Sequence, residues 1–360
     1  MGNLATFGPI VVLMPSDYGS NAILIRSNRV ATLSLPDLDY MEVDFKASEL
    51  TRILQNDSLK NRNSGNIALT RILEWLWDVA VEPVLKELGF TELPRDNDSW
   101  PHIWWIPTDS LALFPIHAAG HHSIKGKNTM DRVISSYAPT ARVLDHARRQ
   151  MSQLKGTSQN VMLVSMSTTP GRKALPFARI EVDRIEKLLP PSIKRFKSER
   201  PMKSEVLEKI RQYSIAHFTC HGETDPEPSM SRILLSDWQT DCISIGDIAQ
   251  EKLDHVELAY ISACHSANHG DRDLVEEAVH LAASFLLAGF PCVIGTLWQV
   301  DDRYSADEAE YVYRSMLRED ATLVLLVQLI SIYHNPRMET WDNGKEINEP
   351  NATKSCMLES

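Results

Sequence analysis

The chain has 360 residues, of which 43% are hydrophobic and 24% are charged, and its formal net charge is -11. These proportions are those of an ordinary globular protein, and the length suggests two packed units. The negative charge argues against a nucleic-acid surface and mildly favours a cationic partner or substrate, although solubility alone is the simpler explanation.

The cysteines and the apolar stretches bear on where the protein works. All 5 cysteines lie in the second half of the chain, without paired spacing or a Cys-x-x-Cys element. This pattern indicates a reducing compartment, so we expect a cytoplasmic protein. No apolar stretch approaches the ~20 residues that cross a bilayer, and we expect no membrane span.

The first half of the chain predicts strands followed by helices. Short apolar runs at residues 9–14 and 22–25 predict two strands around a turn. Apolar residues at helical spacing predict helices over 45–55 and 67–88, and Gly89 is expected to end the second of them.

The next segment is rich in tryptophan and histidine. Residues 104–107 predict a strand that enters a turn, and we expect its two tryptophans in the core rather than in a ligand site. His117, His121 and His122 match no metal-ligand spacing, so we predict no metal site there.

The second half alternates strands and helices, which is typical of a parallel α/β sheet. An apolar run at 161–166 predicts a buried strand, and a helix is predicted over 177–189. Ser204 is a candidate N-cap for the following helix. Residues 167–176 form a loop at the carboxyl end of the first strand, a position that usually helps to line a cleft.

Two later segments each end an apolar run on a reactive side chain. Residues 215–222 read Ile-Ala-His-Phe-Thr-Cys-His-Gly, and residues 258–265 read Leu-Ala-Tyr-Ile-Ser-Ala-Cys-His. Each run predicts a buried strand, so His221 and Cys264 stand where a strand gives way to a loop. Open α/β sheets place chemistry at such strand ends, and the intervening segment is long enough for one crossover. The two segments therefore predict a Cys/His nucleophilic pair.

Other interpretations of these residues stay open at this point. Cys264 alone is also explained as a small buried hydrophobe, and His221 as a loop imidazole. Cys220 and His265 offer an alternative dyad, but neighbouring residues of a strand face opposite sides, so only one of each pair can face a cleft. The same alternation argues against a zinc site that would combine these four residues with His269.

Further motifs surround the two segments. A helix closes on Ala-Gly-Phe at 288–290, residues 293–302 read Val-Ile-Gly-Thr-Leu-Trp-Gln-Val-Asp-Asp, and Leu-Phe-Pro-Ile-His-Ala-Ala lies upstream at 113–119. Together they resemble the CHAT family of caspase-like cysteine peptidases, relatives of separase, from about residue 8 to about residue 318.

The resemblance implies a caspase-like α/β fold, with a mostly parallel sheet flanked by helices, in two packed halves. Residues 1–155 are expected to form a structural, pseudo-caspase-like half, and residues 156–335 the catalytic half. Residues 336–360 are expected to form a polar tail that departs from the family, whose members usually finish with a strand of the type Trp-Ala-Pro-Phe.

The resemblance also selects His221 and Cys264 as the dyad of a cysteine endopeptidase that cleaves a protein partner. Cys264 would attack the scissile carbonyl, and His221 would protonate the leaving amine. Backbone N–H groups of Gly222 and Cys264 would hold the oxyanion, with no cofactor and no metal. The alternative is a catalytically silent CHAT-like binding or scaffold module in a signalling assembly, with a regulatory protein partner. The altered terminus favours that alternative.

The resemblance extends to a substrate pocket. In separase an equivalent Trp-x-Val-x-Asp segment receives arginine, so Trp298, Asp301 and Asp302 are expected to line the pocket for the residue before the scissile bond. Asp301 is favoured slightly over Asp302, which is nearer the helix that follows. Cleavage after a basic residue would result, because a partly desolvated carboxylate favours a guanidinium. The competing explanation is that both carboxylates cap the helix that begins near Tyr304.

Overall fold

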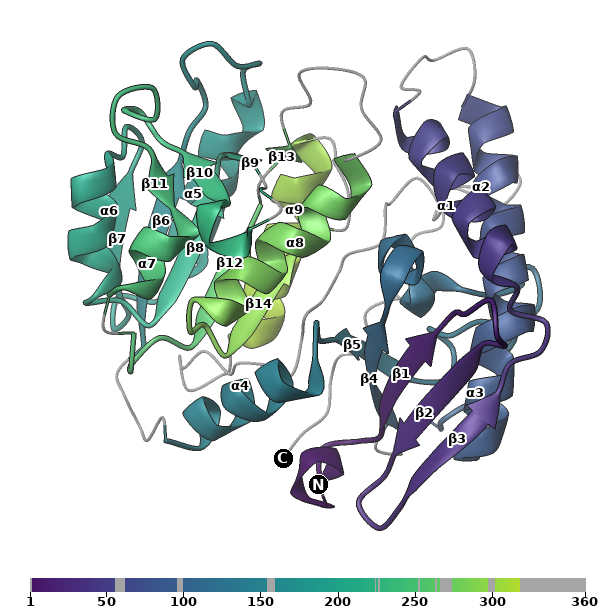
Figure 1. Ribbon diagram of the computed structural model, residues 1–360. Coiled ribbons are helices and arrows are strands. Elements are labelled where there is room, and N and C mark those ends of the chain that lie inside the picture. Colours follow the sequence, from purple (N-terminus) through teal and green to yellow (C-terminus); the bar gives the residue numbers. More distant parts are fainter. Residues whose placement is uncertain are drawn as a thin grey trace. The chain divides into compact units, whose positions relative to one another are not determined.

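The chain divides into two compact units between Leu144 and Asp145 (Figure 1). The computed structural model describes residues 2–55, 62–95, 100–153, 159–223, 225, 227–251, 253–262, 264–265, 274–296 and 302–317. Within these ranges, no helix has the length and apolar character that a membrane crossing requires. The division falls inside helix α4 (Ala141–Gln153), before the boundary that the sequence suggested.

The first unit is built on a five-stranded mixed sheet in the order β3-β2-β1-β4-β5. Its strands are β1 (Ile10–Met14), β2 (Asn21–Ile25), β3 (Val30–Ser34), β4 (His102–Pro107) and β5 (Ile134–Tyr137). β1 pairs antiparallel with β2 and parallel with β4, which pairs parallel with β5. Trp104 and Trp105 of β4 are 5% and 0% exposed, which confirms the prediction that they belong to the core.

Helices follow the first strands of this unit. They are α1 (Tyr40–Gln55), α2 (Arg62–Leu76), the π-helical turn η3 (Trp77–Val81) and α3 (Glu82–Leu88). Gly89 adopts a left-handed φ of 84° after α3, which confirms the predicted helix end, since glycine takes this conformation without a Cβ penalty. The short 3-10 turns are η1 (Gly2–Ala5), η4 (Asp109–Leu113) and η5 (Ile116–Ala118).

The second unit contains a five-stranded sheet in which every pairing is parallel. Its order is β14-β12-β8-β6-β7. Its strands are β6 (Asn160–Ser165), β7 (Lys194–Ser198), β8 (Ile215–Thr219), β12 (Leu258–Ile261) and β14 (Cys292–Gly295). The chain starts at β6, moves outward to β7 and returns to β8 on the other side. The strand order therefore reverses between β6 and β8, where doubly wound sheets open a crevice at the strand carboxyl ends.

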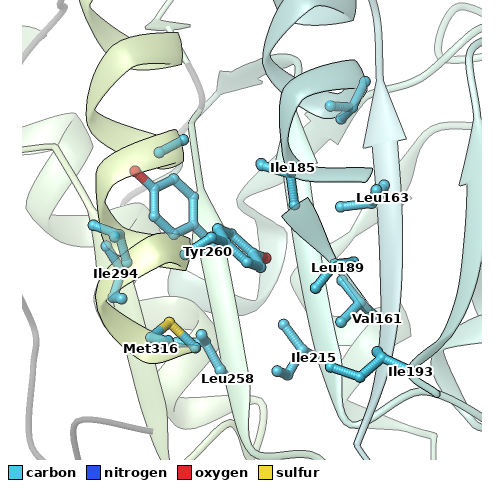
Figure 2. Packing of buried hydrophobic residues seen from close by; sticks show 14 of the residues in the cluster. Val161, Leu163, Ile185, Leu189, Ile193, Ile215, Leu258, Tyr260, Ile294 and Met316 are labelled. Carbon is cyan, nitrogen blue, oxygen red and sulfur yellow. The ribbon is translucent and has the colours of Figure 1, made fainter. Parts of the chain in front are cut away.

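Helices cover this parallel sheet. They are α5 (Pro176–Leu188), α6 (Lys203–Ile210), α7 (Ile245–Ala249), α8 (Leu274–Leu287) and α9 (Asp302–Met316). α5 and α9 pack on one face, where residues such as Ile185, Ile215, Leu258 and Met316 form a buried cluster (Figure 2). Phe218 of β8 lies against Phe285 of α8, with ring centroids 5.6 Å apart. Burial on both sides explains why these strands are continuously apolar.

A small second sheet continues from the parallel one. Its order is β11-β10-β9-β13, with the turn η6 (Pro228–Met230) before β10. The strands are β9 (His221–Glu223), β10 (Arg232–Leu234), β11 (Ile243–Ser244) and β13 (Cys264–His265). β9 follows β8 and β13 follows β12 in the chain, so two adjacent inner strands of the parallel sheet both lead into this sheet. His221 and Cys264 thus lie in short strands, whereas the sequence suggested the start of loops.

Candidate active site

His221 and Cys264 are neighbours across the small sheet. β9 and β13 pair in parallel, with Cys264 as the register partner of His221. The preceding strands have the same sequence offset, since Leu258 pairs with Ile215 and Ile261 with Phe218. The ladder between β8 and β12 is therefore resumed in register by β9 and β13. Because neighbouring strands lie about 4.8 Å apart, the fold brings the two backbones within the reach of a side-chain dyad.

The His221 imidazole is held by a backbone carbonyl from another loop. Its side chain is buried, at 2% exposure, and Nε2 donates to the carbonyl oxygen of Lys173 at 2.8 Å. A carbonyl can only accept, so in the neutral ring Nε2 carries the proton and Nδ1 the lone pair. Lys173 belongs to the loop that follows β6. The contact therefore spans the point where the strand order reverses.

The loop after β6 has further anchors beside the dyad. The Arg172 guanidinium forms an ion pair with Glu223, which directly follows Gly222, and lies 5.0 Å from the centre of the Trp238 ring. Trp238 Nε1 donates to the Pro170 carbonyl at 3.0 Å. A partly buried ion pair and a cation–π contact together restrict this loop, which keeps the Lys173 carbonyl in place.

A buried polar network lies beneath the dyad. Glu181 of α5 is 1% exposed, and its Oε1 accepts from His217 Nε2 at 2.8 Å and from Thr219 Oγ1 at 3.3 Å. Its Oε2 accepts from Ser262 Oγ at 3.0 Å. The network joins one helix to β8 and to the residue that follows β12.

Aromatic rings enclose the His217 imidazole. Tyr260 stacks on it with centroids 4.6 Å apart, and Tyr313 lies 5.6 Å away on α9. Burial, and then the negative charge of Glu181, raise the pKa of the Tyr313 hydroxyl, which remains a neutral phenol.

The structure describes only some of the remaining predicted site residues. Gly222 pairs with Ile233 of β10 on one side and with His265 of β13 on the other. Asp302 is the first residue of α9, while its side chain, Trp298 and Asp301 lie outside the described residues. The side chains of Cys264 and His265 lie outside them as well.

The structure describes only some of the residues of the alternative dyad and of the zinc site considered above. Cys220 is fully buried and lies between the end of β8 and the start of β9. The described residues contain no group of three or more side chains that could bind a metal ion. His269 lies outside them.

Sequence reasoning missed Lys173, Glu181, Thr219 and Ser262. Lys173 acts through its backbone, for which a sequence carries no signal. Glu181 did have a recognisable signal in the sequence. It stands beside Val182 on the apolar face of its predicted helix, where a carboxylate needs a buried partner. Thr219 and Ser262 each precede a dyad residue by two positions in the sequence.

The fold and the paired strand ends define a caspase-like α/β protein. The family model of the CHAT domain matches residues 70–343, which is more than half of the chain. The chain belongs to the CHAT domain family, and this confirms the resemblance seen in the sequence.

Comparison with solved structures supports the same fold. Two crystal structures of the Saccharomyces cerevisiae separase–securin complex are similar to the chain, with TM-scores of 0.55 and 0.56 and identities of 11% and 12%. The matches cover 88% and 87% of this chain but 28% of the other chain in each case. Comparison with curated proteins gives no match. At these identities the structural similarity shows the fold alone.

Proposed function

We propose that this protein is a cysteine endopeptidase of the CHAT type that cleaves a protein partner with a His221–Cys264 dyad. The observation that carries the proposal is the parallel register of the two residues in β9 and β13, the short strands that follow the adjacent strands β8 and β12. Residues paired in neighbouring strands face the same side of a sheet, which is the arrangement that a thiol and an imidazole need to exchange a proton.

The hydrogen bond of His221 supports the role that we propose for it in the reaction. With Nε2–H bound to the Lys173 carbonyl, the Nδ1 lone pair is the basic site that can take the thiol proton. The Cys264 sulfur then adds to the scissile carbonyl carbon. The tetrahedral intermediate collapses as Nδ1–H protonates the leaving amine, and water hydrolyses the acyl-enzyme. The Lys173 carbonyl holds the ring in the orientation and tautomer that both transfers require.

Backbone donors complete the proposed site. The N–H groups of Gly222 and Cys264 are assigned to the oxyanion, because both belong to the strand pair that carries the dyad. Asp301 and Asp302 are assigned, with Trp298, to a pocket for a basic residue before the scissile bond. The solved separase complex contains securin, and we extend the proposal to a regulatory protein partner for this chain.

Labelling with a thiol-reactive substrate analogue tests the dyad. A peptidyl acyloxymethyl ketone is expected to label Cys264, and Cys264→Ala is expected to remove both the labelling and peptide cleavage. Loss of cleavage should exceed ~10³-fold, as for other nucleophiles, with an unchanged circular dichroism spectrum. His221→Ala is expected to remove turnover and to leave slow alkylation of Cys264, because alkylation requires no protonation of a leaving amine.

Another cysteine in the same region supplies the matched control. Cys220 immediately precedes His221 and is fully buried, so Cys220→Ala is expected to keep labelling and cleavage. Cleavage that persists in Cys264→Ala would disprove the dyad. Wild-type protein whose Cys264 resists the probe would instead indicate the silent binding module.

A further inference from the structure

Glu181 connects the two strands that lead to the dyad. One carboxylate oxygen accepts hydrogen bonds from His217 and Thr219, and the other accepts from Ser262. His217 and Thr219 belong to β8, whereas Ser262 directly follows β12. A single side chain therefore fixes the separation of the two strand ends and ties both of them to α5.

The attachment points stand two residues before the dyad residues in the sequence. Thr219 precedes His221 by two positions, and Ser262 precedes Cys264 by two positions. The β8–β12 pairing and the β9–β13 pairing have the same sequence offset, so each attachment point stands just before the pair of strands that carries the dyad. A shift of either attachment point is therefore transmitted through two residues of backbone to the thiol or the imidazole.

Stability alone does not account for the network. Removing a carboxylate from water costs several kcal/mol, and apolar replacements of buried ionic groups are often as stable or more stable. Here the burial is nearly complete, and among the described residues His217 Nδ1 and the Tyr313 hydroxyl have no hydrogen-bond partner. The buried Glu181 network costs desolvation energy and leaves two polar atoms without hydrogen bonds within the described part of the chain. It is therefore better explained by the separation of the two strand ends that it fixes.

We propose that Glu181 is a positioning residue of the active site, which sets the distance between His221 and Cys264 through its hydrogen bonds to Thr219 and Ser262. This inference rests on the proposed peptidase function. It predicts that loss of the hydrogen bond from Thr219 or from Ser262 to Glu181 lowers the rate of the chemical step, because small displacements of reacting groups lower rates strongly. Substrate binding should remain largely unchanged.

Substitution of one hydrogen-bond partner of Glu181 tests the proposal without removing the carboxylate. Glu181→Ala would remove the acceptor of three buried hydrogen-bond donors and destabilise the fold, so Ser262→Ala is the informative variant. Ser165→Ala is its matched control, because Ser165 ends the neighbouring strand β6, is 1% exposed, and its hydroxyl has no hydrogen-bond partner among the described residues. Ser262→Thr retains the hydroxyl and serves as the conservative variant.

The full-length variants are compared by kcat, KM and the rate at which iodoacetamide alkylates Cys264, measured by peptide mass spectrometry. Ser262→Ala is expected to lower kcat and the alkylation rate on the order of 10-fold with little change in KM. Ser165→Ala should match the wild type, and Ser262→Thr should restore both rates.

The two readouts separate the inference from the proposed function. If the wild type cleaves peptides and Ser262→Ala behaves like Ser165→Ala, the positioning role is wrong and the peptidase assignment stands. If the wild type cleaves nothing but alkylation is slowed in Ser262→Ala alone, the positioning role stands and the peptidase assignment is wrong. Equal alkylation and no cleavage would overturn both.

Discussion

The imidazole of His221 depends on residues that lie far from it in the sequence. Its hydrogen bond to Lys173 joins two segments 48 positions apart, and the bond from Ser262 to Glu181 joins residues 81 positions apart. His221 and Cys264 themselves could be predicted, because an apolar run that stops on a reactive side chain is a local pattern. Their supporting groups could not, since these meet only after the sheet has formed.

The two carboxylates at 301 and 302 give a prediction about specificity. If they line the proposed pocket, fluorogenic peptides with arginine or lysine before the scissile bond should be cleaved about 10- to 100-fold faster than those with leucine or methionine. Asp301→Asn or Asp302→Asn should reduce this preference. The reason is that a carboxylate pairs with a cationic side chain through charge-assisted hydrogen bonds, which an amide cannot replace.

Asp307→Asn is the control for this measurement, because Asp307 lies on the same helix, is exposed and pairs with Arg184. α9 begins at Asp302, so a carboxylate at either position also has a role available at the helix N-terminus. An equal rate for basic and apolar substrates, or a basic preference that survives both substitutions, would favour that structural role and exclude the acidic pocket.

At the scale of single elements, helix ends were harder to predict than helices. The predicted helix at 177–189 matches α5 (Pro176–Leu188), whereas Ser204 lies inside α6 instead of capping it. The N-terminal N–H of Lys203 is satisfied by the Asp237 carboxylate at 3.1 Å, a partner that the sequence around the helix does not contain. Strand β7 was not predicted, because its sequence Lys-Arg-Phe-Lys-Ser suits an edge strand with little apolar content.

Asp247 gives a prediction about the short helix α7. Ser244 and Asp247 form a capping box, and Lys203 Nζ lies 3.1 Å from the Asp247 carboxylate. Burial raises the pKa of Asp247, but the hydrogen bonds from Ser244 and the ion pair with Lys203 outweigh it and hold the pKa below its ordinary value of 3.8. Asp247→Asn is expected to lower the free energy of unfolding by about 0.5–2 kcal/mol at pH 7.

The sign of the pH dependence follows from the lowered pKa. The charged form stabilises the folded state above the unfolded pKa, and this contribution is lost as the pH falls through the folded value. Urea unfolding of wild type and Asp247→Asn should therefore differ at pH 7 and converge below pH 3.8. Asp254→Asn, at an exposed position outside the helix, should show no comparable loss at pH 7. If the difference in unfolding free energy between wild type and Asp247→Asn is unchanged at low pH, the charge of Asp247 does not stabilise the helix.

At the scale of the whole molecule, the sequence predicted a parallel α/β fold and the CHAT resemblance, and both are confirmed. It did not give the strand order, in which β6 starts in the interior of the sheet and β8 and β12 become neighbours. That order depends on how crossovers pack on the sheet rather than on any one segment. The catalytic assignment of the second half and the cytoplasmic location stay predictions.

The two units lead to a last prediction, about cooperativity. Each unit has its own sheet and its own buried residues, and domains of this kind usually fold as separate units. Leu24 of β2 and Leu163 of β6 are both 0% exposed, so they provide matched substitutions in the two units. Leu24→Ala is expected to destabilise the first unit by about 2–5 kcal/mol, because it leaves a cavity in a packed core.

Native-state hydrogen exchange read by mass spectrometry distinguishes the units. Leu24→Ala should accelerate exchange in β1, β2, β4 and β5 and leave β6, β8 and β12 unchanged, whereas Leu163→Ala should do the reverse. The rate of Cys264 alkylation should change in Leu163→Ala and not in Leu24→Ala, since every proposed site residue lies in the second unit. If either substitution accelerates exchange equally throughout the chain, the two units unfold as one, and the proposed boundary near residue 155 does not separate independent folding units.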